Sequence, residues 1–94
     1  MSLYSNGKLN LKSIGSNMTE LEVGNTSILF SYQTPVAGYD DQGAFRSSDW
    51  FSMTTTKHIN KYLGGKDVGR EVDQSYIEDL VNIDKIPIRV NIII

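Results

Sequence analysis

Hydroxyl and basic side chains gather in one stretch of the chain, Ser52-Met-Thr-Thr-Thr-Lys-His58. The stretch lies at the predicted start of a helix, where free backbone N–H groups and a partial positive charge attract anions. The sequence therefore predicts phosphate or carboxylate binding, with Ser52, Thr54, Thr55, Thr56, Lys57 and His58 as candidate ligand-binding residues. No glycine-rich run precedes Lys57, so this is not a P-loop. A threonine that serves only as the helix N-cap is the alternative interpretation.

His58 is the single histidine of the chain. Histidine is the commonest general base in enzymes, but a base needs a nucleophile or substrate within reach and usually an acid to orient it. The sequence does not place an aspartate or glutamate beside His58. A packed or surface histidine on a helix is the simpler interpretation, and we expect no enzymatic activity.

Two other segments contain residues that suit an anionic or nucleotide ligand. Lys66 and Arg70 lie in a glycine-containing loop, residues 66–72, which could close over an anion. A solvated linker between two helices explains this loop equally well. Tyr32 is one of several aromatic residues that could stack on a base, with packing in the core as the alternative.

Composition excludes several other classes of site. The chain has no cysteine, so disulfides, thiolate metal sites and a cysteine nucleophile are impossible. The formal net charge of -2 argues against general nucleic-acid binding. Asp40, Asp41 and Asp49 could bind a metal ion, but a polar hairpin tip explains the first two more simply. We therefore expect no metal and no cofactor.

Hydropathy gives no reason to expect a membrane partner. Residues 1–8 lack the apolar core of a signal peptide. No apolar run approaches the length that spans a bilayer. We expect the protein to act in a cytoplasm.

The elements that must position these residues predict an α+β fold. We expect a single domain over residues 1–94, in which a small antiparallel sheet of about five strands packs with two short helices. Alternating residues over 8–14 predict an edge strand, and residues 20–33 predict a hairpin that turns at Gly24-Asn25. Pro35 marks a bulge, bend or edge, after which residues 36–39 continue as a strand.

The second half of the chain contains the predicted helices. Short strands are expected at residues 45–46 and 50–53, with most of the apolar residues in the latter packed in the core. The first helix begins at a threonine N-cap and ends at Gly64-Gly65. A second helix, capped by Asp73, covers residues 74–82, with Tyr76, Ile77, Leu80 and Val81 on its buried face.

The last residues, Ile86-Pro-Ile-Arg-Val-Asn-Ile-Ile-Ile94, predict a strand with one fully apolar face. An uncovered apolar strand promotes aggregation, so another strand must cover it. That strand belongs either to the same domain or to another subunit. The tail therefore favours a homo-oligomer without requiring one.

Two motifs in the middle of the chain resemble a known family. Ser31-Tyr-Gln-Thr-Pro-Val-Ala37 and Ser52-Met-Thr-Thr-Thr-Lys-His58 are similar to the Ser-Tyr-x-Thr-Pro-Val-Ala and Ser-x-Thr-Thr-x-Lys-His motifs of small tailed-phage proteins of unknown function. The resemblance implies a phage gene product in the cytoplasm of an infected cell. It adds Thr34 to the candidate ligand-binding residues, whereas the isoleucine-rich tail departs from the shorter members.

Together these observations predict a small phage accessory protein. The hypothesis that fits the residues best is a non-enzymatic anti-defence protein, which as a homo-oligomer sequesters a phosphorylated small molecule such as a nucleotide immune signal. One alternative is an inhibitor whose acidic surface docks on a host defence or metabolic enzyme. Another is a structural accessory of the virion, assembled through the tail. The α+β fold and the resemblance to phage proteins do not decide between these three functions.

Overall fold

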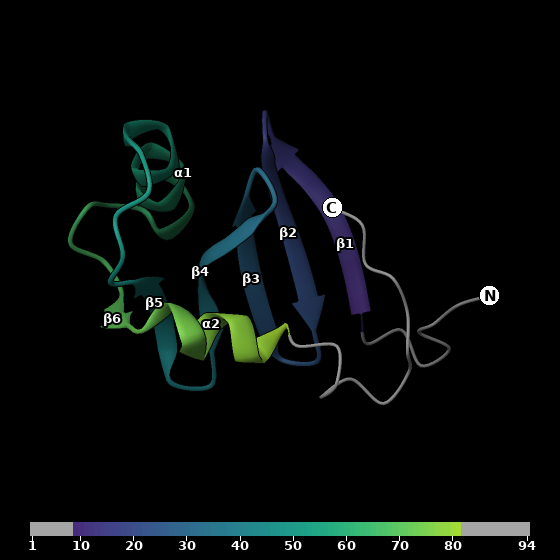
Figure 1. Cartoon of the computed structure of the whole chain (residues 1–94). Coiled ribbons are helices and arrows are strands. Elements are labelled where there is room, and N and C mark those ends of the chain that lie inside the picture. Colours follow the sequence, from purple (N-terminus) through teal and green to yellow (C-terminus); the bar gives the residue numbers. More distant parts are fainter. Residues whose placement is uncertain (1–8, 82–94) are drawn as a thin grey trace.

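A computed structural model describes residues 9–81 of the chain as a six-stranded sheet with two helices (Figure 1). The elements in chain order are β1 (Leu9–Gly15), β2 (Met18–Val23), β3 (Thr26–Ser31), β4 (Thr34–Asp40), β5 (Gly43–Ser47), α1 (Met53–Leu63), β6 (Arg70–Val72) and α2 (Gln74–Leu80). This arrangement confirms the predicted α+β class. The predicted strand over residues 86–94, and any role it has in oligomerisation, lie outside the described residues.

The strands follow one another across the sheet in the order β1-β2-β3-β4-β5-β6. The first five are joined by short turns and pair antiparallel, while β6 pairs parallel to β5. The predicted turn at Gly24-Asn25 is confirmed, because Val23 pairs with Thr26 on either side of it. The expected irregularity at Pro35 is also confirmed, since the β3–β4 register shifts where Pro35 pairs with Phe30.

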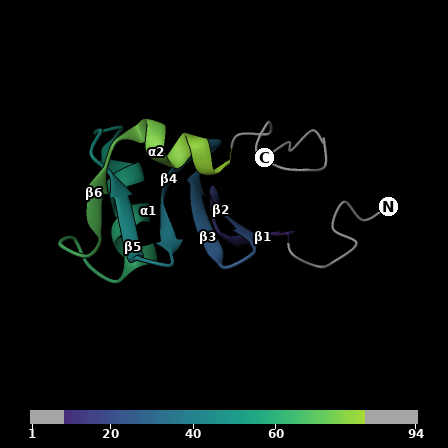
Figure 2. The ribbon, with the colours of Figure 1, turned by 90° about the horizontal axis from the view of Figure 1, so that it is seen from below.

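Each side of the sheet is covered by a different helix. Successive residues of a strand point to opposite faces, and in β3 this separates Ile28 and Phe30 from Leu29. One buried cluster joins β2, β3 and β5 to α2; its members are Leu21, Ile28, Phe30, Phe45 and Ile77. The other joins β2, β3 and β4 to α1; its members are Met18, Leu29, Val36, Ala37, Ile59 and Leu63. Figure 2 shows α2 crossing one side of the strands.

The start of α1 differs from the prediction. The N-cap is Ser52 and not a threonine, because the Ser52 side chain accepts a hydrogen bond from the Thr55 amide at 3.0 Å. The predicted strand at residues 50–53 is wrong, since Met53 already belongs to the helix. Trp50 and Met53 are 72% and 69% exposed, so their expected core role is wrong as well. The predicted helix end is confirmed at Gly64, which adopts a left-handed conformation.

The segment after α1 also contains more structure than predicted. Its last three residues, Arg70–Val72, form β6, where only a loop was expected. Asp73 then occupies the N-cap position of α2, as predicted, but its side chain makes no capping hydrogen bond. Only Ile77 of the helix is fully buried, whereas Tyr76 is 37% exposed and not a core residue.

No helix among residues 9–81 is long and apolar enough to cross a membrane.

Candidate functional site

The end of β3 meets the first two turns of α1 through a buried polar contact. The Oγ of Ser31 lies 2.7 Å from Nδ1 of His58 and 2.9 Å from Oγ1 of Thr55. Ser31 and Thr55 are both buried, and the ring of His58 is half-buried. Twenty-seven residues separate Ser31 from His58. The fold therefore joins two segments that the sequence keeps apart.

Tyr32 is the next residue along the chain, and it has an unusual backbone. Its φ angle is 59°, in the left-handed region that bulky residues rarely adopt. The Tyr32 amide donates to the carbonyl oxygen of Asn17 at 2.8 Å, which holds the conformation in place. Its ring lies 5.8 Å from the His58 ring, centroid to centroid, and the residue remains 49% exposed. Strained residues of this kind concentrate at functional sites.

Tyr32 also lines a hollow in the surface of about 500 Å³. Polar side chains from the β1–β2 turn, β2, the β3–β4 turn and the start of β4 line the hollow; the residues are Asn17, Thr19, Tyr32, Gln33 and Thr34. Tyr32 and Thr34, both predicted ligand-binding residues, thus share one hollow. Amide, hydroxyl and phenol groups can donate to and accept from a polar ligand.

Most of the hydroxyls at the start of α1 are bonded within the protein. Ser52 acts as the cap, and Thr55 contacts Ser31. The Oγ1 of Thr56 donates to the Ser52 carbonyl oxygen at 2.9 Å. Thr54 and Lys57 are exposed, and their side chains make no hydrogen bond or ion pair with another residue among residues 9–81. They are therefore the side chains of this turn that can reach a ligand without breaking an internal contact.

Lys66 lies away from this end of α1. It is exposed and follows the C-terminal end of the helix at Gly64. An 11-residue helix is about 16 Å long, so the two ends of α1 are well separated. The structure therefore does not bring Lys66 to the start of the helix.

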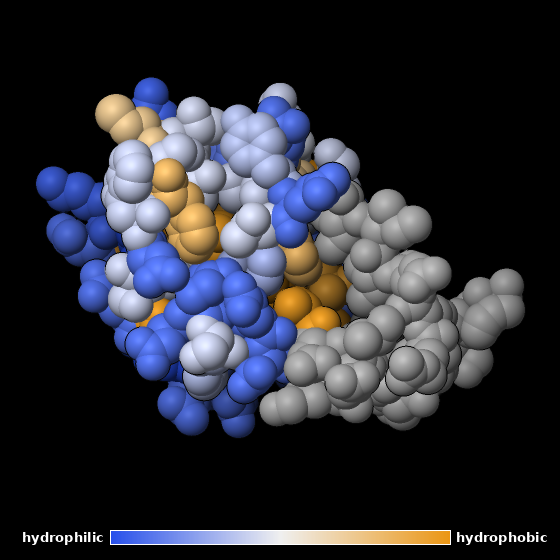
Figure 3. Space-filling view, in the orientation of Figure 1, coloured by the Kyte–Doolittle hydropathy of each residue, from blue (hydrophilic) through white to orange (hydrophobic). Residues whose placement is uncertain are grey.

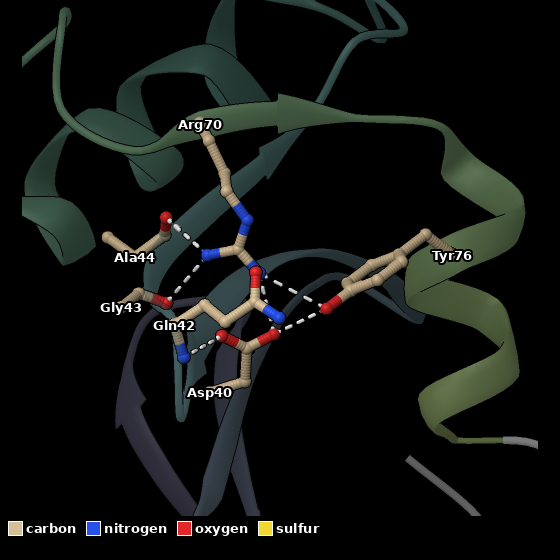
Figure 4. Close-up of polar contacts among 6 residues, drawn as sticks. All are labelled: Asp40, Gln42, Gly43, Ala44, Arg70 and Tyr76. Atoms are coloured by element: carbon tan, nitrogen blue, oxygen red, sulfur yellow. Dashed lines mark hydrogen bonds and ion pairs between the residues drawn. The ribbon is translucent and has the colours of Figure 1, made fainter.

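Arg70 is engaged in a separate polar cluster beside α2 (Figure 4). Its Nη2 donates to Oδ2 of Asp40 at 2.7 Å and to the Tyr76 hydroxyl at 3.1 Å. Its Nη1 lies 3.3 Å from two backbone carbonyl oxygens, those of Gly43 and Ala44. The Tyr76 hydroxyl donates to the same oxygen of Asp40 at 2.5 Å. These contacts fasten α2 to β4 and β6.

The cluster changes the acidity of the groups within it. Burial alone would raise the pKa of Asp40, but hydrogen bonds from Tyr76, Arg70 and the Gln42 amide together hold that pKa below the ordinary value of 3.8. The hydrogen bond to Asp40 raises the pKa of both Tyr76 and Arg70. Asp40 is therefore an anion at neutral pH, paired inside the protein, and it does not belong to a free acidic surface.

We expect Asp40→Asn to reduce stability in a pH-dependent way. Because the native pKa of Asp40 lies below its unfolded value, its charge stabilises the fold fully above the unfolded pKa. This contribution disappears as the pH falls through the native pKa. Urea denaturation should therefore show the largest difference between wild type and Asp40→Asn near neutral pH, and the difference should shrink as the pH falls below the ordinary aspartate pKa of 3.8. Asp41→Asn, at an exposed neighbour, is the control; an identical pH dependence in Asp40→Asn and wild type would contradict the assignment.

Sequence reasoning missed one member of the site and most of the hollow. Ser31 was not predicted to bind or position anything, although it alternates with Leu29 and so faces α1. Asn17 and Gln33 are turn residues, and no sequence signal separates such residues from ordinary turns. Within the described part of the chain, no group of three or more histidine, aspartate or glutamate side chains could hold a metal ion.

The chain matches the family described as a family of unknown function (DUF8033) over residues 4–79. The match covers most of the chain, and the protein belongs to this family. No curated protein and no solved structure matches the chain significantly.

Proposed function

We propose that this member of the family is a non-enzymatic binding protein that sequesters a phosphorylated small molecule. The ligand occupies the hollow beside Tyr32 and reaches the exposed start of α1. We take the ligand to be a nucleotide that serves as an immune signal, held by a homo-oligomer in a phage-infected cell. The phage setting and the anti-defence role follow from the resemblance of the two motifs alone.

The observation that carries the proposal is the meeting of the two motif segments. Ser31 contacts both His58 and Thr55, and the ring of Tyr32 lies against that of His58. Residues that pack only for stability rarely leave an aromatic ring half exposed on a strained backbone. The polar hollow lined by Tyr32 offers a site in which a bound ligand would contact the exposed part of this ring.

The chemistry of the surrounding groups favours a phosphorylated ligand with a base. Lys57 supplies an exposed positive charge at the end of α1 where backbone N–H groups point outward. Tyr32 offers a partly exposed ring on which a base can stack. The polar lining from Asn17, Gln33 and Thr34 suits the edges of a base or a ribose.

Thermal unfolding in the presence of nucleotides tests the proposal. A ligand at a hundred times its Kd stabilises the native state by about 2.7 kcal/mol. For a domain of this size, that corresponds to a rise in Tm of roughly 10–20 °C. We expect such a rise with at least one compound from a set of cyclic, linear and ADP-ribose-type nucleotides. If none of them shifts Tm, the proposal fails.

Lys57→Ala and Lys61→Ala form a matched pair for the same experiment. Both lysines are exposed on α1, but Lys61 lies in the last turn. Removing a charged hydrogen-bond donor from the site should weaken binding about tenfold or more, so Lys57→Ala should reduce the rise in Tm. Lys61→Ala should leave it unchanged. Equal effects of the two substitutions would indicate general charge attraction and not a site at the start of the helix.

An inhibitor that docks on a host enzyme is the second candidate. The exposed acidic residues around α2 favour it: Glu71, Asp73, Glu78 and Asp79. In the view of Figure 3, hydrophilic residues cover the region of α2. Asp40 does not contribute, since its side chain is 7% exposed and paired with Arg70. A host protein captured by wild type and lost with Glu78→Lys would favour this function over nucleotide binding.

A further inference from the structure

The contacts of His58 determine which of its ring nitrogens carries the proton. Thr55, Ser31 and His58 form a chain with two contacts, Oγ1 to Oγ and Oγ to Nδ1. Each contact requires one proton between its two atoms. Each hydroxyl owns one proton, and a neutral imidazole adds one more on either Nδ1 or Nε2.

Only one arrangement of the protons satisfies every buried group. If Nδ1 is unprotonated, Thr55 donates to Ser31 and Ser31 donates to Nδ1, so two protons serve two contacts. If Nδ1 carries a proton, three protons compete for the same two contacts. One hydroxyl proton then has no acceptor, although both Ser31 and Thr55 are 5% exposed or less. A buried donor without a partner disfavours that arrangement by about tenfold or more.

We propose that Ser31 and Thr55 are positioning residues that hold His58 as the Nε2–H tautomer. The Ser31 hydroxyl occupies Nδ1, whereas Nε2 makes no hydrogen bond within the described residues 9–81. The half-buried ring therefore presents an N–H donor beside Tyr32. This donor selects a ligand that offers a hydrogen-bond acceptor at that position, such as a phosphate or carboxylate oxygen.

The tautomer itself does not depend on ligand binding, whereas the choice of an acceptor ligand rests on the proposed function. Experiments can therefore contradict the tautomer assignment and the proposed binding function independently of each other. A single tautomer without any response to nucleotides would support the relay and contradict the binding role. A mixture of tautomers in a protein that binds nucleotides would overturn the relay and leave the binding role intact.

Long-range ¹H–¹⁵N correlation spectra of the full chain measure the tautomer directly. His58 is the single histidine, so its ring signals need no assignment by mutagenesis. At about pH 8.5, where an ordinary histidine is neutral, we expect the wild type to show the Nε2–H form almost alone. A substantial Nδ1–H population in the wild type overturns the proposal, whether or not any variant folds.

Three substitutions separate the relay from a general packing effect. Ser31→Ala removes the donor to Nδ1, so the spectrum should move toward the mixture of the free imidazole. Thr55→Val leaves Ser31 to donate to Nδ1 and should keep most of the Nε2–H form. Lys61→Ala, at an exposed position in the last turn of the same helix, should leave the tautomer unchanged. If Ser31→Ala folds and keeps the wild-type tautomer, Ser31 does not set it.

Discussion

Replacing Gly38 with alanine should unfold the protein or leave it barely stable. Gly38 lies in the middle of β4, between Ile28 of β3 and Phe45 of β5. A Cβ at this position would lie 2.2 Å from the carbonyl oxygen of Ser27 and 2.7 Å from Cζ of Phe45. The first contact is with the backbone of β3, which cannot move without breaking the ladder that holds both clusters. We expect a loss of more than about 3 kcal/mol, a large share of the stability of a small domain.

Urea denaturation followed by circular dichroism measures this loss, and Gly24→Ala is the matched control. Gly24 has a φ angle of 61° and open space around its Cβ position. Alanine there should reduce stability by about 1 kcal/mol, through backbone conformation alone. Adding Phe45→Leu to Gly38→Ala should not restore folding, because the clash with Ser27 remains. Recovery of stability in that double variant would show that the ring of Phe45, and not the backbone, limits position 38.

The parts of the fold that the sequence predicts are those governed by local rules. Alternation over residues 26–31 separates the two faces of β3 because neighbouring side chains point in opposite directions. Glycine marks the β2–β3 turn and the end of α1 because it adopts left-handed conformations without strain. These signals depend on a few adjacent residues and need no knowledge of the rest of the chain.

The parts that were missed depend on contacts between distant segments. The three residues of β6 are a strand only because Arg70, Glu71 and Val72 pair with β5. Trp50 looks like a core residue, yet the chain leaves the sheet at that point and the side chain stays exposed. Burial and pairing of this kind are tertiary properties, which override local preference.

The same distinction applies to the candidate site. The sequence indicates a helix start that is suited to anion binding, and in the structure α1 does begin at Met53. It cannot indicate that Ser31 reaches His58, because that contact requires α1 to pack on the face of β3 that carries Leu29. It also groups Arg70 with the basic residues of a loop, whereas the pairing of β6 places Arg70 beside Asp40.

Replacing Tyr32 with asparagine should abolish most of the binding while leaving the fold as stable as before. Asparagine adopts left-handed conformations more readily than tyrosine, so the substitution relieves strain of about 1–2 kcal/mol. It also removes the half-buried ring, a loss of similar size. The two effects oppose each other, and we expect the free energy of unfolding to change by less than about 1 kcal/mol. Loss of a stacking partner for a base should weaken nucleotide binding by roughly ten- to a hundredfold.

Tyr39→Asn distinguishes this result from the ordinary effect of removing a tyrosine. Tyr39 is 38% exposed and its ring contacts that of Tyr62, but its φ angle is not positive. Without strain to relieve, this substitution should lower stability by about 1–2 kcal/mol, and it should leave nucleotide binding unchanged. If both substitutions destabilise the protein equally, the left-handed backbone at Tyr32 stores no strain. If Tyr32→Asn binds nucleotide as tightly as wild type, the Tyr32 ring does not contribute to ligand binding.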